Sequence, residues 1–535
     1  MKILFFMTHP GFTRNFESTL ALLAERGHQI HLACDGPPQV GKPSAIEALE
    51  SRYPARITHG PAPDRDDAWS PLANAARATR SYLRYLHPRY HQATRLRERA
   101  VVWPLGSVLN AIAASPLGGQ RGLTVLDALL RGLEQIVPSS PEIERFIRAQ
   151  QPDAVLLTPV VDFNTAQTDQ LKSARALGVP TGVCVASWDN LTNKGLIQIR
   201  PDLVTVWNEH QRQEAIELHH VPPERVEATG AQIFDEWFVR RPTTTRQQFC
   251  ERAGLPADRP FVLYTCSSQW IAPHEVPFAR RWLAAVRAGP EPLASAGLLI
   301  RPHPQNAEQW QDVDLSADGA ATIWPRDPTA RVDDQSKADF FDSLYHSAAV
   351  VGINTSALIE AGIVGRPVFT VLDDEYRSSQ DGTLHFRYLV EVSDGLLQVA
   401  RSLPEHVEQL GAALAGGGHD ARARTFVTAF VRPHGIDRPA TPILANAIER
   451  LQASPTPAEP TPRWARAARP PLFGLALLAR AAWRRLKKRP PPLARCAART
   501  STASTSLPTA VERGGRLPVS PLPRTGRGAG GEGLP

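Results

Sequence analysis

The sequence predicts an α/β protein with two doubly wound domains, each built on a parallel sheet that helices cover on both faces. Two observations carry this prediction. At the start of the chain, the apolar run KILFFM is followed by an amphipathic helical pattern and a second apolar run, HQIHLAC. The same alternation recurs within residues 153–229 and again from residue 261 onward. Near-continuously apolar strands that alternate with helices are typical of buried parallel sheets.

The first domain is predicted to span residues 1–240. Between its early and late strands, residues 60–150 are rich in Arg, Ala and Pro, and they are predicted to form a mainly helical insertion. A polar, proline-containing stretch around residues 240–260 marks the expected domain boundary. The strands of this domain are expected at residues 2–7, 28–34, 153–158, 179–186, 202–207 and 225–229.

The second domain is predicted to span residues 255–450. Its apolar runs again alternate with helical patterns, and they end in polar loops. In an open parallel sheet, ligands bind beyond the carboxyl ends of the strands, so these loops are the expected binding region. The strands are expected at residues 261–265, 297–301, 321–324, 348–353 and 367–371.

The remaining residues, 451–535, form a tail rich in Pro and Arg. It holds 15 Lys and Arg against 3 Glu, a net charge of +12, whereas the whole chain carries only +7. The first 450 residues are therefore mildly acidic, at a net charge of −5, which argues against a nucleic-acid partner. The low content of core-forming residues predicts a disordered basic tail.

Within the tail, a helix is predicted near residues 470–488. The apolar stretch PPLFGLALLARAAW is too short to span a membrane, but two tryptophans and an Arg/Lys cluster flank it. Such a segment suits the interface of an anionic membrane, with residues 464–489 as the contact. A basic tail without membrane contact is the alternative.

The cysteines and the N-terminus predict a cytoplasmic protein, and the membrane contact predicted for the tail would attach it to the inner face of the membrane. There are five cysteines, an odd number without a CxxC spacing, so the sequence predicts neither a zinc ribbon nor a disulfide framework. The N-terminal apolar run lacks the length and cleavage site of a signal peptide. No His, Cys, Asp or Glu cluster has the spacing of a metal site, so neither a metal nor another cofactor is expected.

The second domain supplies the strongest candidate site, in the stretch INTSALIEAG. A strand that meets a helix through small polar residues leaves backbone N–H groups free to bind an anion. Thr355 or Ser356 is the expected N-cap, and Asn354 precedes them. Glu360 is misplaced for a capping box, but it lies four residues after Ser356 and so shares its helix face. An ordinary capped helix with a solvated glutamate is the alternative.

Two further loops of the second domain follow predicted strands. In RPHPQN, two prolines flank His303, and Arg301 has a side chain that can donate two hydrogen bonds to a phosphate. A turn with a surface histidine is the alternative. Ser267 and Ser268 follow FVLYT and give a weaker signal, because small residues are common at such positions.

The first domain places polar residues after its own strands. His9 has a pKa range suited to a general base, although a structural histidine fits the spacing equally well. The loop SWDNLTNKG concentrates polar residues around Trp188. The candidate catalytic residues are His9 and Asp189, and the candidate acceptor or cleft residues are Arg14, Asn190, Lys194 and His385.

Several of these motifs resemble the GT-B class of sugar transferases over residues 1–450. MKILFFMTHPGFTRNFESTLALLAERGHQIHLA is similar to the opening of GT-B N-terminal domains. RVEATGAQIFDEW resembles the segment that closes this domain in CDP-glycerol glycerophosphotransferase-like and UDP-GlcNAc 2-epimerase-like members. IRPHPQN is similar to the His-Pro motif of capsule and sialic-acid-type transferases, and NTSALIEAGIVGRPV resembles their donor helix.

The resemblance implies two Rossmann-like domains that face each other across a cleft, with the nucleotide donor in the second. Arg301 and His303 would contact the donor nucleotide or its phosphates, and Glu360 would accept from ribose or sugar hydroxyls. Asn354, Thr355 and Ser356 would hold the diphosphate, and His9 would lie where many inverting members carry their base. The second donor-helix glutamate of retaining members is absent, because position 368 is Val.

The favoured function is metal-independent transfer of a sugar from a nucleotide-activated donor to a surface polysaccharide or glycolipid. Transfer of a polyol phosphate from a CDP-activated donor is the nearest alternative, because the His-Pro motif occurs there too. A UDP-sugar 2-epimerase shares the fold, but no clear carboxylate set for proton abstraction is present. A catalytically inactive GT-B-like protein that its tail recruits to a membrane is a further alternative.

Overall fold

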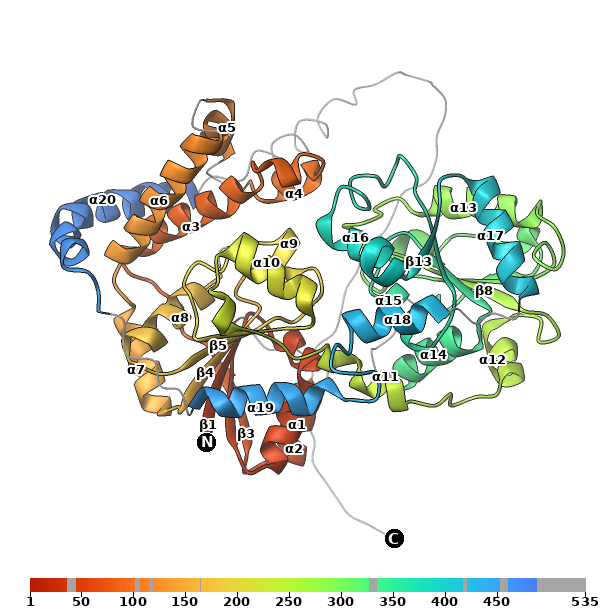
Figure 1. The fold of residues 1–535 in the computed structure, drawn as a ribbon, viewed down its shortest axis with the longest axis horizontal. Coiled ribbons are helices and arrows are strands. Elements are labelled where there is room, and N and C mark those ends of the chain that lie inside the picture. Colours follow the sequence, from red (N-terminus) through yellow and green to blue (C-terminus); the bar gives the residue numbers. More distant parts are fainter. Residues whose placement is uncertain are drawn as a thin grey trace, which may run out of the picture. The chain divides into compact units, whose positions relative to one another are not determined.

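Two parallel sheets form the framework of the chain in the computed structural model (Figure 1). The structure describes residues 1–35, 45–101, 106–115, 119–163, 165–326, 334–416, 421–452 and 460–487. Nine of the thirteen described strands are buried at most of their residues, the four at the sheet edges less so, and helices pack against both faces of each sheet. The prediction of two doubly wound α/β domains is therefore confirmed.

The first sheet has seven parallel strands in the order β3-β2-β1-β4-β5-β6-β7. The chain runs outward from β1 in one direction and then returns to β4 on its other side. The loops after β1 and β4 therefore part at this point, where α/β sheets bind their ligands. The strands are β1 Lys2–Met7, β2 Gln29–Cys34, β3 Ile57–Pro61, β4 Ala154–Thr158, β5 Thr181–Cys184, β6 Leu203–Val206 and β7 Val226–Ala228.

The second sheet has six parallel strands in the order β10-β9-β8-β11-β12-β13. Its reversal of direction falls between β8 and β11, so the loops after these two strands form the corresponding binding position. The strands are β8 Phe261–Thr265, β9 Gly297–Arg301, β10 Ala321–Ile323, β11 Ala349–Gly352, β12 Val368–Val371 and β13 Leu397–Ala400.

Helices occupy most of the predicted insertion in the first domain, although β3 extends into its first residues. The insertion contains α3 Ser70–Arg84, α4 Thr94–Arg99, α5 Gly106–Ala114, α6 Gln120–Ile136 and α7 Pro141–Gln150. The other helices of the first domain are α1 Glu17–Glu25, α2 Ala45–Arg52, α8 Gln167–Ala176, α9 Asn190–Asn193 and α10 Glu209–His219, with the short 3-10 helix η1 Pro10–Asn15 after β1.

The helices of the second domain connect its strands in turn. They follow a short linking helix, α11 Asp235–Val239. They are α12 Arg246–Ala253, α13 Val276–Arg287, α14 Asp334–His346, α15 Ala357–Ile363, α16 Leu384–Glu391, α17 Leu403–Ala415 and α18 Ala421–Phe430.

Helix α19, Ala440–Gln452, belongs to the first domain in space, whereas the predicted boundary at residue 450 assigned it to the second. Its apolar face joins the core against α1 and the first sheet. A Cβ on Gly182 in β5 would lie 3.2 Å from Leu451, so glycine at this position allows the close approach of the helix. Asp235 accepts hydrogen bonds from the Ala440 and Thr441 N–H groups, at 3.1 and 2.7 Å, and so caps the helix.

The tail contains a longer helix than the sequence predicted. Helix α20 covers Arg463–Lys487, starting seven residues earlier than the predicted helix near 470–488. Its buried residues pack against Trp69, Ile136 and Val137 of the helical insertion. The predictions for residues 453–459 and 488–535 lie outside the described residues. Within the part of the chain that the structure describes, no helix combines the length and apolar character needed to cross a membrane.

Candidate functional site

His9 lies in the loop after β1, where the order of the first sheet reverses. It precedes η1, and its Nδ1 accepts a hydrogen bond from the Gly11 N–H at 3.1 Å. Its ring lies 4.5 Å from that of Phe12, centroid to centroid. Partial burial and the cations Lys194 and Arg14 lower the pKa of His9, and Asp162 only partly offsets them. The imidazole is therefore mostly neutral near pH 7, the form that a general base requires.

Asp162 is a site residue that the sequence reasoning missed. It follows β4, on the other side of the reversal point, and accepts from Lys194 Nζ at 2.7 Å and from Thr8 Oγ1 at 3.2 Å. Lys194 Nζ also lies 5.8 Å from the Phe12 ring centroid. The predicted residues His9 and Lys194 thus lie in one region of the structure. Asp162 pairs with Lys194, and its negative charge acts on His9.

A second group joins the first domain to α16 of the second. Asp189 accepts from Asn193 Nδ2 at 2.6 Å, and Thr192 Oγ1 lies 3.4 Å from His385 Nδ1. The His385 ring meets Trp188 edge to face at 4.9 Å. Burial would raise the pKa of Asp189, but His385, Lys194 and hydrogen bonds from its own loop lower it, so this carboxylate is ionised at neutral pH. Asn190, also predicted here, is buried and its Nδ2 lies 3.4 Å from Asp189 Oδ1.

The loops at the reversal point of the second sheet are fixed by buried hydrogen bonds. The Ser267 N–H donates to Glu275 Oε2 at 2.9 Å, and its hydroxyl accepts from the Asn354 N–H at 3.4 Å. Asn354 Nδ2 donates to the Ser379 carbonyl at 2.6 Å. Ser267 and Asn354 are both buried, so in this structure they position the two loops rather than present free side chains.

The remaining polar residues of these loops are more accessible. Ser356 is exposed and occupies the N-cap position of α15, but its side chain makes no capping hydrogen bond. Thr355 Oγ1 accepts weakly from the Ala357 N–H at 3.5 Å. Ser268 is partly exposed, and its carbonyl accepts from the Ile271 and Ala272 N–H groups. Their predicted contacts with a diphosphate remain predictions.

The structure separates the two predicted residues of RPHPQN. The Arg301 Cζ packs 5.3 Å from the Trp324 ring centroid and 5.2 Å from that of Phe340, so its guanidinium faces the aromatic side of the domain. Burial lowers the pKa of Arg301 to about 10, with Asp339 opposing the change, and its Nη1 is buried without a hydrogen-bond partner. In this position the guanidinium is not open to a phosphate ligand, unlike the predicted role of Arg301.

His303 instead lies near the first domain. Its Nδ1 accepts from the Gln305 N–H at 3.1 Å. Burial, together with the charge of Arg14, lowers the pKa of His303 to about 4. The ring is therefore neutral at pH 7, and because Nδ1 accepts a hydrogen bond, Nε2 carries the N–H.

Arg14 connects the two domains electrostatically. It is exposed in η1 of the first domain, yet its charge acts on His303 and also on Glu360 of α15. In the described part of the chain, neither the Arg14 guanidinium nor the Glu360 carboxylate has a hydrogen bond or an ion pair. η1 itself is held in place, because Asn15 Nδ2 donates to the Ala186 carbonyl at 2.8 Å and the Asn15 carbonyl accepts from Gln232 Nε2 at 2.8 Å.

Glu360 has an unusual protonation equilibrium. Burial raises the pKa of Glu360 to about 7, and Arg14 only partly opposes this shift. At neutral pH the side chain is thus divided between the acid, which can donate a hydrogen bond, and the carboxylate, which can accept two. A mixed donor and acceptor beside a free cation suits a ligand that carries both hydroxyl and phosphate groups.

The raised pKa predicts a pH-dependent cost of Glu360 to stability. The folded state holds its proton up to about pH 7, whereas the unfolded chain releases it near pH 4.5, so stability falls as the pH rises between these values. We expect Glu360→Gln to gain about 1–2 kcal/mol more free energy of unfolding at pH 8 than at pH 5, allowing for partial solvent access. Denaturant titrations at both pH values measure this difference. The exposed Glu251→Gln is the control, and equal gains at both pH values would contradict the assignment.

A cavity of about 400 Å³ opens at the carboxyl ends of β1, β2, β3 and β4. Three carboxylates line it: Asp35, Asp64 and Asp162. Burial raises the pKa of Asp35 to about 6, with Asp64 adding to the shift and a Gln170 hydrogen bond opposing it. Burial likewise raises the pKa of Asp64. Such side chains offer both donors and acceptors, which suits a ligand rich in hydroxyl groups.

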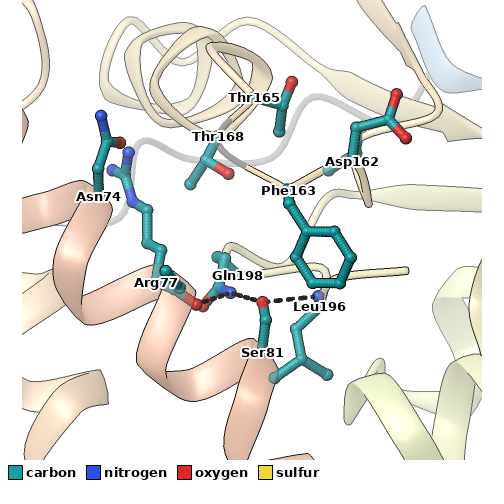
Figure 2. A pocket seen from close by; sticks show the side chains of 11 residues that line it. Asn74, Arg77, Ser81, Asp162, Phe163, Thr165, Thr168, Leu196 and Gln198 are labelled. Atoms are coloured by element: carbon teal, nitrogen blue, oxygen red, sulfur yellow. Dashed lines mark hydrogen bonds between the residues drawn. The ribbon is translucent and has the colours of Figure 1, made fainter. Parts of the chain in front are cut away.

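A smaller chamber of about 20 Å³ adjoins this cavity and shares Asp162, Phe163 and Thr165 with it (Figure 2). It has room for about one water molecule. One wall is α3, where Ser81 Oγ accepts from the Leu196 N–H at 3.2 Å and from Gln198 Nε2 at 3.1 Å. The chamber links the helical insertion to the floor of the larger cavity, which gives residues 60–150 a structural role at the site.

In the described residues, no three His, Cys, Asp or Glu side chains gather as a metal site. The four cysteines among them, Cys34, Cys184, Cys250 and Cys266, are buried and unpaired. The expectations of no metal and no cofactor remain predictions.

No protein-family model matches this sequence, and no curated protein matches it either. Solved structures do match. UDP-GlcNAc 2-epimerase from Neisseria meningitidis bound to UDP-GlcNAc shares 14% identity at a TM-score of 0.46, covering 84% of this chain and 100% of that one. A glycosyltransferase from Rickettsia africae shares 10% identity at a TM-score of 0.47, covering 84% of this chain and 98% of that one. MurG from Acinetobacter baumannii shares 12% identity at a TM-score of 0.40, covering 84% of this chain and 99% of that one.

These matches extend to the fold and no further. At these identities and TM-scores they carry no argument about this chain, whose two-domain α/β architecture rests on the two parallel sheets described above. The chemistry of this chain has to be argued from its own side chains.

Proposed function

We propose that this protein is a GT-B transferase that moves a sugar from a nucleotide-activated donor to a hydroxyl-rich acceptor. One observation carries the proposal: the unpaired Arg14 of the first domain acts on both His303 and Glu360 of the second. A free cation opposite a neutral imidazole and a protonatable carboxyl matches a sugar diphosphate, which presents anionic oxygens next to hydroxyl groups.

Each group takes a role that its environment favours. Arg14 neutralises charge that develops on the departing diphosphate, and His303 donates from Nε2 to a phosphate oxygen. Glu360 binds a hydroxyl of the ribose or of the sugar. The neutral His9, in the loop after β1, removes a proton from the acceptor hydroxyl as it attacks the anomeric carbon, and Asp162 stabilises the imidazolium that results.

The acceptor is proposed to bind in the cavity of about 400 Å³ that Asp35, Asp64 and Asp162 line. Thr8, the residue before His9, lines this cavity, which supports an acceptor within reach of His9. A polysaccharide or glycolipid headgroup fits a cavity of this size and polarity. Asp189, which is ionised and accepts a hydrogen bond from Asn193, interacts electrostatically with His385 of α16 at the domain boundary.

Thermal shift with a panel of nucleotides tests the donor site first. A ligand that binds only the folded chain at a hundred times its Kd stabilises it by about 2.7 kcal/mol. We expect UDP or another nucleoside diphosphate to raise Tm, and His303→Ala to weaken that binding by about tenfold. His434→Ala, an exposed histidine elsewhere in the chain, is the matched control. Preference for CDP and CMP would favour polyol-phosphate transfer, and no shift with any nucleotide would contradict the proposal.

Product analysis then separates transfer from its alternatives. Incubation with a UDP-sugar and an acceptor mixture should give UDP and an extended glycan. Conversion of the sugar to its 2-epimer without an acceptor would instead identify an epimerase. Nucleotide binding without turnover under any condition would indicate the inactive GT-B-like alternative.

A further inference from the structure

The outer surface of helices α5, α6 and α20 is unusually apolar. In the described residues, eleven large hydrophobic side chains are strongly exposed, and eight of them lie on these three helices. Isolated exposed hydrophobic residues are common on proteins, but a concentration of this kind marks an interaction surface. The eight are Val108, Val125, Leu129, Trp464, Phe473, Leu475, Leu477 and Leu478.

On α20 the exposed apolar residues form a continuous stripe. Six exposed residues follow each other at intervals of three or four, the spacing that keeps side chains on one helix face. Leu478 in this stripe is 68% exposed. The six are Trp464, Ala467, Pro471, Leu475, Leu478 and Ala482.

The opposite face of α20 is fixed to the helical insertion, so the stripe faces outward. Ala465 and Ala476 are fully buried against it. Arg469 Nε donates to the Ile136 carbonyl at 2.9 Å, and Arg480 forms an ion pair with Asp66 at 3.0 Å. Rotation of the helix to hide the stripe would break these contacts.

The stripe continues onto α6. Val125 and Leu129 lie one turn apart there, and Leu129 is 65% exposed. Gly132 is the next residue on this face, and a Cβ at that position would lie 3.7 Å from the Trp464 ring. The two exposed apolar faces therefore meet at Gly132 and Trp464. We call this combined surface the α6/α20 face.

Basic residues border the α6/α20 face. Helix α20 contains seven Lys and Arg and no acidic residue. Arg463, Arg466 and Arg484 are exposed. At 100° per residue Arg463 flanks the stripe, whereas Arg466 and Arg484 lie farther round the helix, beside the exposed Leu477. The sequence continues with more cations, in the run RRLKKR over 484–489. An apolar stripe beside an acid-free row of arginines is the composition of helices that lie in the membrane interface.

We propose that the α6/α20 face binds the surface of an anionic lipid bilayer. The exposed leucines and Trp464 enter the boundary between headgroups and acyl chains, while the arginines pair with lipid phosphates. A protein partner would more often pair an apolar patch with charges of both signs, and α20 offers only one sign. This inference does not depend on the reaction that the two domains catalyse.

Flotation of the full chain with lipid vesicles tests the proposal. The chain should bind vesicles of 30% phosphatidylglycerol in phosphatidylcholine, and it should bind pure phosphatidylcholine at least tenfold more weakly. The variant Leu475→Asp with Leu478→Asp should lose binding. The triple variant Arg463→Gln, Arg466→Gln and Arg484→Gln should weaken it by about 100-fold at low salt, since each cation near an anionic surface contributes about 1 kcal/mol.

Val239→Asp places the same charge on an exposed valine of α11, away from this face, and should bind as the unaltered chain does. Unchanged melting curves verify that the variants fold. Failure of the unaltered chain to bind anionic vesicles, or full binding by the double Asp variant, would overturn the proposal. So would a concentration-dependent dimer that the double Asp variant abolishes, because a second copy would then cover the face.

Discussion

Replacement of Arg14 by glutamine is expected to lower kcat/KM for sugar transfer by about 100-fold. Arg14 is the cation whose charge lowers the pKa of both His303 and Glu360, and it has no protein counter-ion of its own in the described residues. Loss of one charged donor to a developing anion costs on the order of 10²–10³ in rate. Because Arg14 is exposed and makes no hydrogen bond in the described structure, its replacement should leave the melting temperature unchanged.

The size of the loss in kcat/KM should depend on the side chain that replaces Arg14. Arg14→Lys should recover part of the activity, because it keeps the charge but not the planar fork of the guanidinium. Arg145→Gln, an exposed arginine on α7, is the control and should retain full activity. Retention of kcat/KM within twofold in Arg14→Gln would contradict the assignment of Arg14 to the diphosphate. A pH profile adds a second readout, because removal of Arg14 should raise the pKa of Glu360 above about 7.

The fold was predictable from the sequence wherever strands are buried on both faces. Apolar runs such as KILFFM and FVLYT are strands at their predicted bounds. The two missed strands, β3 and β13, are both at the edge of a sheet. Their residues are only partly buried, and β3 has a single fully buried position, so neither carries a continuous apolar signal. The other two edge strands, β7 and β10, were predicted, so a position at the edge weakens the apolar signal without always removing it.

The candidate site was predictable in position but not in detail. Loops after buried strands were identified correctly, because the carboxyl ends of parallel strands share one edge. What the sequence lacks is the surroundings of each side chain: Arg301 packs on Trp324 and Phe340, while the pKa of His303, two residues later, responds to the charge of Arg14. Asp162 was missed although it follows the predicted strand DAVLLT, because its partner Lys194 is 32 residues away.

Replacement of Asp169 by asparagine is expected to destabilise the protein by about 3–5 kcal/mol at pH 7. Asp169 in α8 is almost fully buried. It forms ion pairs with Arg77 Nη1 of α3 at 2.6 Å and with Arg65 Nη1 at 2.7 Å. Arg77 also pairs with Glu134 of α6 at 2.8 Å, and Lys172 with the same glutamate at 2.7 Å. Removal of one partner leaves buried cations without compensation, which costs more than the pair itself contributes.

The pKa values set the pH range of this stabilisation. Burial alone would raise the pKa of Asp169, but Arg77 and Arg65 hold it well below its usual range, and Arg77 and Lys172 lower the pKa of Glu134 to about 2. A depressed carboxyl pKa stabilises the fold above the unfolded value near 4, and this contribution is lost as the pH falls toward the folded value. The gap between the unaltered chain and Asp169→Asn should therefore be full at pH 7 and shrink below pH 4.

Urea titrations followed by tryptophan fluorescence measure this gap. Glu217→Gln, which removes the exposed pair with Arg89, is the matched control and should cost about 0.5 kcal/mol or less. Asp169→Leu combined with Arg77→Met should recover part of the loss, because apolar side chains of similar volume can replace a buried ion pair. A cost below 1 kcal/mol for Asp169→Asn would show that the charge network does not hold α3 and α6 against α8. In that case the helical insertion, with the wall of the smaller chamber and the α6/α20 face, would depend on its apolar contacts alone.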